Sequence, residues 1–210
     1  SLGEGGHVRD KDGTFAAFLT AELAAFAKNN NTTLYGLLDE KIYLDPKIGL
    51  FVNGYEPDPM DGEYPGIVGD RIKKNILRLT YSLFYKALAG DLEIAGMHVK
   101  SANIYRTGKY DHVYPATMDF QFPDEGIRFY FDEEKLNYVT IRPSGTGNSL
   151  RFHTQLYSMI NEDNLDISVP ENKAELMKKL ILKKELLRNQ TKHIFSDIRL
   201  KLDAPKERVF

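Results

Sequence analysis

The sequence predicts an α+β fold, and three observations lead to this prediction. Segments near both ends repeat apolar residues at the spacing of a helix. Four short segments between residues 94 and 157 have the apolar and β-branched character of strands. A stretch rich in proline and glycine separates the first two helical segments from the rest. We therefore expect one sheet with two helices on one face, because a sheet and a helix each bury their apolar side against another layer.

Two helices are predicted in the first 47 residues. Asn29-Asn30-Asn31 stops the first, and Thr32 or Thr33 caps the second. Their apolar stripes consist of Phe15, Phe18, Leu19, Leu23 and Phe26 in the first and Leu34, Leu37, Leu38 and Ile42 in the second. Two such helices bury little by themselves, so they need a further surface.

The segment that follows is predicted to be a linker, residues 48–65, because prolines and glycines cluster there. The predicted organisation is thus 1–47 as one part, 48–65 as linker, 66–202 as an α+β domain and 203–210 as a frayed tail. Within the domain, a helix runs from Asp70 to a stop at Gly90, and a last helix begins near Pro170. The predicted strands lie around Met97 and Val99 and at 127–131, 138–141 and 150–157, with 107–123 as a hairpin or long loop.

Composition excludes several classes of protein. The 210 residues are 42% hydrophobic and 28% charged, with a net charge of −2, as in ordinary globular proteins. The charge balance gives no support for a nucleic-acid partner, and no apolar run is long enough for a membrane span. Cysteine is absent, which excludes disulfides, thiol catalysis and thiolate metal sites and favours a cytoplasmic location. The basic residues at 178–192 are interpreted as the solvated face of a helix.

The strongest chemical signal is the loop between the last two predicted strands. Arg142 and Arg151 flank it, and guanidinium groups bind phosphate through paired hydrogen bonds. Its glycines, Gly145 among them, allow backbone N–H groups to turn inward as an anion nest. Further side-chain donors are Ser144, Thr146, Asn148 and Ser149. Nothing in the loop activates a nucleophile, so the residues predict phosphate binding; a plain hairpin turn with two solvated arginines is equally compatible with them.

A second candidate lies at the start of the chain. Glu4 could accept hydrogen bonds from sugar hydroxyls, and His7, Arg9 and Lys11 form a cationic cluster just before a helix, where anions are favoured. A solvated N-terminal segment without a ligand is the alternative.

Together these segments resemble the α-D-phosphohexomutases, the phosphoglucomutase and phosphomannomutase superfamily. Arg142-Pro143-Ser144-Gly145-Thr146 looks like the phosphate-binding loop of their C-terminal domain. The beginning resembles part of their third domain, which has a sugar-recognition loop of the form Gly-Glu-Glu-Ser followed by His, Arg, Lys-Asp-Gly and an apolar helix. Here Ser1 stands at the serine of that loop, followed by His7, Arg9 and Lys11-Asp12-Gly13. The resemblance covers about residues 1–48 and 66–160.

The resemblance implies a fold and a reaction. The fold would be a four-stranded, largely antiparallel sheet packed by helices on one face, the TATA-binding-protein-like C-terminal domain, preceded by two helices from the end of the third domain. The parent enzyme would interconvert hexose 1-phosphate and hexose 6-phosphate through a bisphosphorylated sugar. Arg142, Ser144, Thr146 and Arg151 would hold the non-reacting phosphate, and Ser1 and Glu4 would contact sugar hydroxyls. His7, Arg9 and Lys11 would neutralise charge near the reacting phosphate.

The chain also departs from the family. Gly147-Asn148 replaces the common Glu-Pro after the threonine, and neither the phosphorylated serine loop nor the Asp-Gly-Asp magnesium loop occurs. We therefore expect the C-terminal piece of a mutase, inactive alone and binding no Mg²⁺ itself. The parent would use Mg²⁺ and a hexose 1,6-bisphosphate as activator or intermediate, with hexose phosphates and the missing N-terminal domains as partners. The alternative is a stand-alone, non-catalytic module that binds phosphate or another protein.

Overall fold

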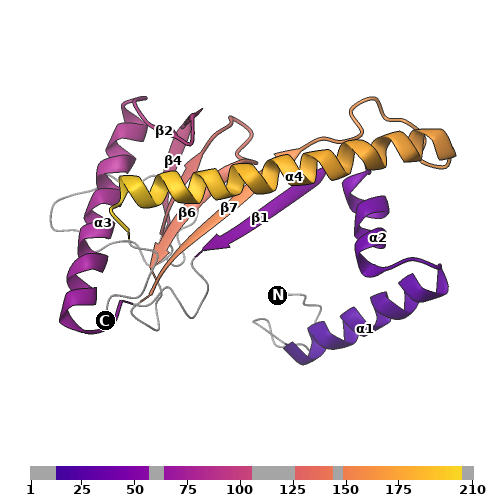
Figure 1. Ribbon diagram of the computed structural model, residues 1–210, viewed down its shortest axis with the longest axis horizontal. Coiled ribbons are helices and arrows are strands. Elements are labelled where there is room, and N and C mark those ends of the chain that lie inside the picture. Colours follow the sequence, from indigo (N-terminus) through magenta and orange to yellow (C-terminus); the bar gives the residue numbers. More distant parts are fainter. Residues whose placement is uncertain (1–12, 57–63, 106–125, 144–148, 205–210) are drawn as a thin grey trace. The chain divides into compact units, whose positions relative to one another are not determined.

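The computed structural model describes residues 13–56, 64–105, 126–143 and 149–204. Their contacts divide the chain into two compact units, one formed within 1–50 and 159–180 and the other within 51–158 and 181–210 (Figure 1). The division near residue 50 falls inside the predicted linker, whereas the grouping of 159–180 with the first unit was not predicted. Within the described ranges, no helix combines the length and apolar character that crossing a membrane requires.

The first unit begins with the two predicted helices. Helix α1 spans Gly13–Asn29 and ends at the predicted asparagine run, where Asn31 adopts a φ of 51°. Helix α2 spans Leu34–Leu38 and is capped by Thr33, whose hydroxyl accepts a hydrogen bond from the Gly36 N–H at 3.0 Å. A π-helical turn, η1 (Asp39–Tyr43), follows. The helix stop and one of the two proposed caps are thus confirmed.

A buried asparagine organises the rest of this unit. The Asn161 side chain is 1% exposed and donates to the carbonyl oxygens of Leu44 and Leu165 at 3.3 and 3.0 Å. It also accepts from the Leu165 N–H at 2.8 Å, so its amide joins two segments that are far apart in sequence. An ion pair of 2.7 Å between Lys173 and Glu40 adds a second link.

The second unit contains a five-stranded sheet in the order β1-β7-β6-β5-β4. The strands are β1 (Leu50–Glu56), β4 (Ser101–Tyr105), β5 (Gly126–Tyr130), β6 (Tyr138–Pro143) and β7 (Leu150–Ser158), and the pairs β4–β5, β5–β6 and β6–β7 are antiparallel. The expected α+β class is confirmed, but the expected count of four strands is wrong for this sheet. The additional strand is β1, which lies in the predicted linker: the prolines there mark the end of a strand and not a strand-free connection.

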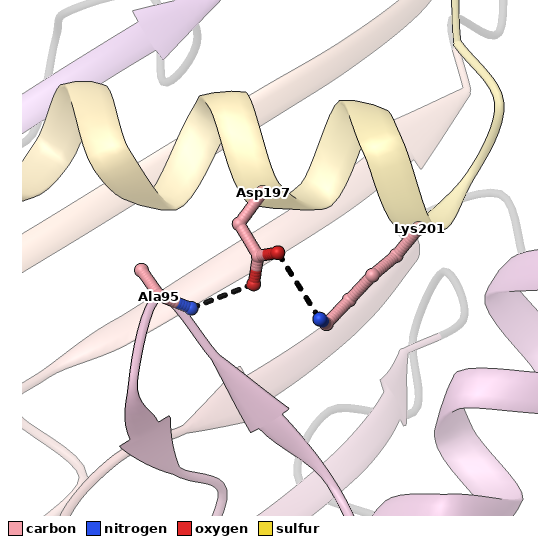
Figure 2. Close-up of polar contacts among 3 residues, drawn as sticks. All are labelled: Ala95, Asp197 and Lys201. Atoms are coloured by element: carbon pink, nitrogen blue, oxygen red, sulfur yellow. Dashed lines mark hydrogen bonds and ion pairs between the residues drawn. The ribbon is translucent and has the colours of Figure 1, made fainter.

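The β-like stretch predicted within 94–104 falls on two elements: its last residues belong to β4, and the part around Met97 forms a separate hairpin. Strands β2 (Glu93–Ile94) and β3 (Met97–His98) pair with each other across a turn in which Ala95 and Gly96 have φ of 52° and 73°. In Figure 2 the Asp197 carboxylate accepts a hydrogen bond from the Ala95 N–H at 2.7 Å and pairs with Lys201 at 3.1 Å. The hairpin is thereby attached to helix α4 (Pro170–Lys201).

The core of this unit lies between the sheet and two helices. Helix α3 (Gly66–Leu88) begins four residues before the predicted Asp70, and Gly90 follows it in the left-handed conformation, as its stop signal predicts. The buried cluster takes Ile76 and Phe84 from α3, Ile194 and Ile198 from α4, and alternate residues of the strands (Ile104, Ile127, Phe129, Val139, Ile141, Leu150, Phe152). Both helices therefore cover the same face of the sheet, as the sequence predicted.

The remaining predicted segments are the tail at 203–210 and the hairpin or loop at 107–123. The tail expected at 203–210 begins in ordered structure, because Ala204 is 7% exposed and its N–H donates to the Arg199 carbonyl oxygen at 2.9 Å. The predicted hairpin or loop at 107–123 lies outside the described residues.

Candidate functional site

Strands β6 and β7 place the two candidate arginines opposite each other. Arg142 and Arg151 are cross-strand partners in the antiparallel register, and Pro143 pairs with Leu150 one position further on. The described ends of β6 and β7 thus place both arginines at the same end of the sheet. Because side chains alternate along a strand, the burial of Ile141, Leu150 and Phe152 toward the helices places both arginines on the opposite face.

Only three of the predicted site residues are described. Arg142 is exposed, Arg151 is half-buried, and Ser149, the residue before β7, is 6% exposed. The remaining predicted residues lie outside the described ranges: Ser144, Gly145, Thr146 and Asn148 of the loop, and Ser1, Glu4, His7, Arg9 and Lys11 of the first segment. Their roles stay predictions.

A third arginine, Arg128 on β5, shares the helix-free face of the sheet. Its Nε donates to the Thr140 hydroxyl at 2.8 Å. Its guanidinium carbon lies 4.0 Å from the centre of the Tyr138 ring and 5.1 Å from that of Tyr105. Cation–π contacts of this kind hold a positive charge in place without a carboxylate partner.

His153 on β7 lies among these charges. It is the cross-strand partner of Thr140, and its ring meets the Tyr55 ring edge-on with 4.6 Å between centroids. Burial lowers the pKa of His153, and the positive charges of Arg142, Arg151 and Arg128 lower it further. The imidazole is therefore neutral near pH 7, when it keeps one N–H donor and one acceptor nitrogen.

On β4 and β5, the helix-free face carries buried tyrosine side chains. The hydroxyl groups of Tyr105 and Tyr130 are hydrogen-bonded to each other, and both residues are buried. Burial and this hydrogen bond raise the pKa of Tyr130, so its phenol is neutral at physiological pH and is no general base. Among the described strand residues of this face, the basic side chains are Arg128, Arg142, Arg151 and His153.

Electrostatics make this region suited to anions. None of the strand residues described on the helix-free face is an Asp or Glu. Among the residues with described positions, no group of three His, Cys, Asp or Glu side chains could hold a metal ion. The magnesium loop expected elsewhere in a parent enzyme is not tested by these residues, and the arrangement by itself can bind an anion but supplies no activated nucleophile.

Sequence reasoning singled out Arg142 and Arg151 but not Arg128 and His153. Both missed residues occupy polar positions in alternating strands, so their face could be read from the sequence. What the sequence did not reveal is the register, Arg128 opposite Thr140 and Thr140 opposite His153, that brings them beside the two arginines.

Comparison with protein-family models and with curated proteins finds no match for this chain.

Proposed function

We propose that this chain is the C-terminal, substrate-phosphate-binding part of a phosphohexomutase. The observation that carries the proposal is the cross-strand pairing of Arg142 with Arg151 beside segment 144–148. Two guanidinium groups at one end of a sheet, flanking a Gly-, Ser- and Thr-rich loop, match the chemistry of a phosphate monoester. Arg142 and Arg151 would hold the non-reacting phosphate, with donors from Ser144, Gly145, Thr146, Asn148 and Ser149.

The reaction of the parent would be phosphoryl transfer between the C1 and C6 oxygens of a hexose, through a bisphosphorylated sugar. This part would supply binding energy and no nucleophile. Fixing the remote phosphate orients the other end of the sugar for attack, which raises the rate because position and orientation are then already restricted. Hexose phosphates would be the ligands, Mg²⁺ would be held by another domain, and the cytoplasm would be the location.

The proposed domain organisation assigns the helices of residues 1–47 to the end of a third, sugar-binding domain. The TATA-binding-protein-like assignment of the sheet domain is part of the same proposal. Helices α3 and α4 on one face of an antiparallel sheet support it, and strand β1 is an addition to the four strands it requires.

The test uses the longer parent enzyme with the change Arg142→Ala. A charge-assisted hydrogen bond contributes roughly 1.5–3 kcal/mol, so affinity for the sugar phosphate should fall by about 10- to 100-fold. Arg188→Ala on the exposed side of α4 is the matched control and should leave affinity unchanged. Equal affinities for the two variants would contradict the proposal.

A second test uses the 210-residue chain alone in a coupled mutase assay. The proposal expects no turnover, because the catalytic serine and magnesium loops are absent from the sequence. Activity that follows the chain through repurification would overturn it. If the chain binds inorganic phosphate but no parent mutase activity depends on Arg142, a stand-alone phosphate-binding module becomes the better description.

A further inference from the structure

The arginines on the two faces of the sheet differ in how their charges are balanced. On the helix-covered face, Arg199 is 5% exposed and its Nε bonds the Glu56 carboxylate at 3.0 Å. On the helix-free face, neither Arg128 nor Arg151 has a carboxylate within ion-pair distance among the described residues. Arg199 thus has an internal counter-charge, whereas the described residues provide none for Arg128 and Arg151.

Arg128 is nonetheless held in a fixed position. The hydrogen bond to Thr140 and the rings of Tyr138 and Tyr105 hold its guanidinium. Because side-chain conformational entropy is already lost in the free protein, an anion that binds here does not have to order the side chain. A fixed cation without a counter-charge is the arrangement expected of a binding residue.

One N–H donor of Arg151 makes no hydrogen bond to any described residue. Its Nε is buried and has no hydrogen-bond partner among the described residues, while its guanidinium carbon lies 6.0 Å from the centre of the Tyr55 ring. A buried donor left without a partner costs free energy of folding, and buried polar groups are nearly always satisfied. An oxygen atom of a ligand would remove this cost.

His153 completes the cluster. The charged groups that face it are Arg151 on its own strand, Arg142 on β6 and Arg128 on β5, and Tyr55 of β1 packs against its ring. A neutral imidazole in this position can donate one hydrogen bond to an anion without adding to the repulsion among three arginines.

We propose that Arg128, Arg151 and His153 extend the phosphate site from the end of β6 and β7 onto the helix-free face of the sheet, where they bind the oxygens of a phosphoryl group. The inference rests on the proposed function, which gives the class of ligand, a phosphorylated sugar. The position of the site comes from the three described residues. The inference assigns Arg128 and His153 as additional binding residues for the phosphate that Arg142 holds.

The experiment titrates the 210-residue chain with inorganic phosphate at constant ionic strength, maintained with sodium chloride. NMR follows two groups of signals, the amides of 144–149 and the imidazole of His153. Phosphate should raise the pKa of His153, because a nearby anion stabilises the protonated ring. The reference is the pKa of His153 in sodium chloride alone at the same ionic strength, because salt by itself screens the neighbouring arginine charges.

Variants identify the residues that contribute. Arg128→Gln should weaken phosphate binding by about three- to tenfold. This loss of affinity lies between the loss expected for an exposed ion pair and that expected for a buried hydrogen bond to a charged group. Arg188→Gln makes the same charge change on the exposed surface of α4 and should have no effect. His153→Gln keeps a hydrogen-bond donor and does not change a full charge. It tests the same site if Arg128→Gln fails to fold.

The possible outcomes separate this inference from the proposed function. If the amides of 144–149 respond to phosphate and His153 does not, the sheet-face extension is wrong and the proposed function stands. If His153 responds and Arg128→Gln weakens phosphate binding, the extension is supported. This result holds even if Arg142→Ala leaves the parent enzyme's affinity for sugar phosphate unchanged, an outcome that would contradict the proposed function alone. Equal phosphate affinity for Arg128→Gln and Arg188→Gln overturns the extension.

Discussion

Helices α1 and α3 both carry apolar residues at helical spacing but have very different surroundings. In α3, Ile76 and Phe84 are fully buried against the sheet, whereas in α1 only Ala27 is buried, with Phe18 and Phe26 70% and 53% exposed. The difference shows that an apolar stripe predicts a helix without specifying what covers it. The stability of α3 comes from tertiary packing, whereas α1 buries little apolar surface among the described residues and depends more on its own helical hydrogen bonds.

Hydrogen exchange should show this contrast most strongly. Amides of 14–42 should exchange through openings at least about 4 kcal/mol less costly than those of 127–157, roughly a thousandfold in protection. The reason is that buried apolar contacts stabilise the strands and are nearly absent from α1. Mass spectrometry or NMR of the 210-residue chain measures both regions together, and equal protection would show that the stripe of α1 is covered in solution.

Truncating one phenylalanine in each unit should give the next largest effect. Phe129→Ala removes a side chain that is 0% exposed and should lower the free energy of unfolding by about 3–5 kcal/mol. Phe18→Ala removes the same atoms from a 70% exposed position and should change it by less than about 0.5 kcal/mol. Denaturant unfolding followed by circular dichroism measures both, and similar costs would refute the contrast.

Gly54 tests how tightly strand β1 packs against α4. A Cβ at this position would collide with Thr154, Thr191 and Phe195, so Gly54→Val should cost about 1–3 kcal/mol by overpacking. Gly13→Ala at the start of α1 meets nothing within 4 Å and serves as the control, with little change expected. If Gly54→Val were as stable as the native chain, β1 would not lie against α4 as described.

The smallest expected effect concerns pH. Folded His153 has a lowered pKa, so below its ordinary value of 6.5 the unfolded chain binds more protons than the folded one. Stability contributed by this group is therefore present above about pH 6.5 and is lost as the pH falls toward the folded pKa. The change should stay below about 1 kcal/mol because the ring is only half-buried.

His153→Gln should remove this part of the pH dependence, measured as the difference in unfolding free energy between pH 7.5 and 5.5. Arg151→Gln should raise the pKa of His153, observed directly by NMR, because one neighbouring positive charge is lost. A pKa of His153 that does not respond to Arg151→Gln would show that the cluster of charges is more widely spaced than described.

The sequence alone determined the features that depend on neighbours along the chain. The asparagine run ends α1, Thr33 caps α2, and the alternation in β5 and β7 separates a buried face from a polar one. Arg142 and Arg151 could be selected because they flank a loop of turn-forming residues. The helix stop, the cap and the strand alternation were predicted correctly because they are local properties of the backbone, whereas the role of the two arginines stays a prediction.

Only the tertiary structure decided which segments meet. Strand β1 was hidden because the prolines that follow it marked the whole segment as a linker, and its pairing with β7 joins residues about 100 positions apart. The same holds for Arg128 and His153, which come together through the register of three strands. Register and covering surfaces arise from long-range packing, in which the apolar face of each element selects its partner, and no local pattern encodes that selection.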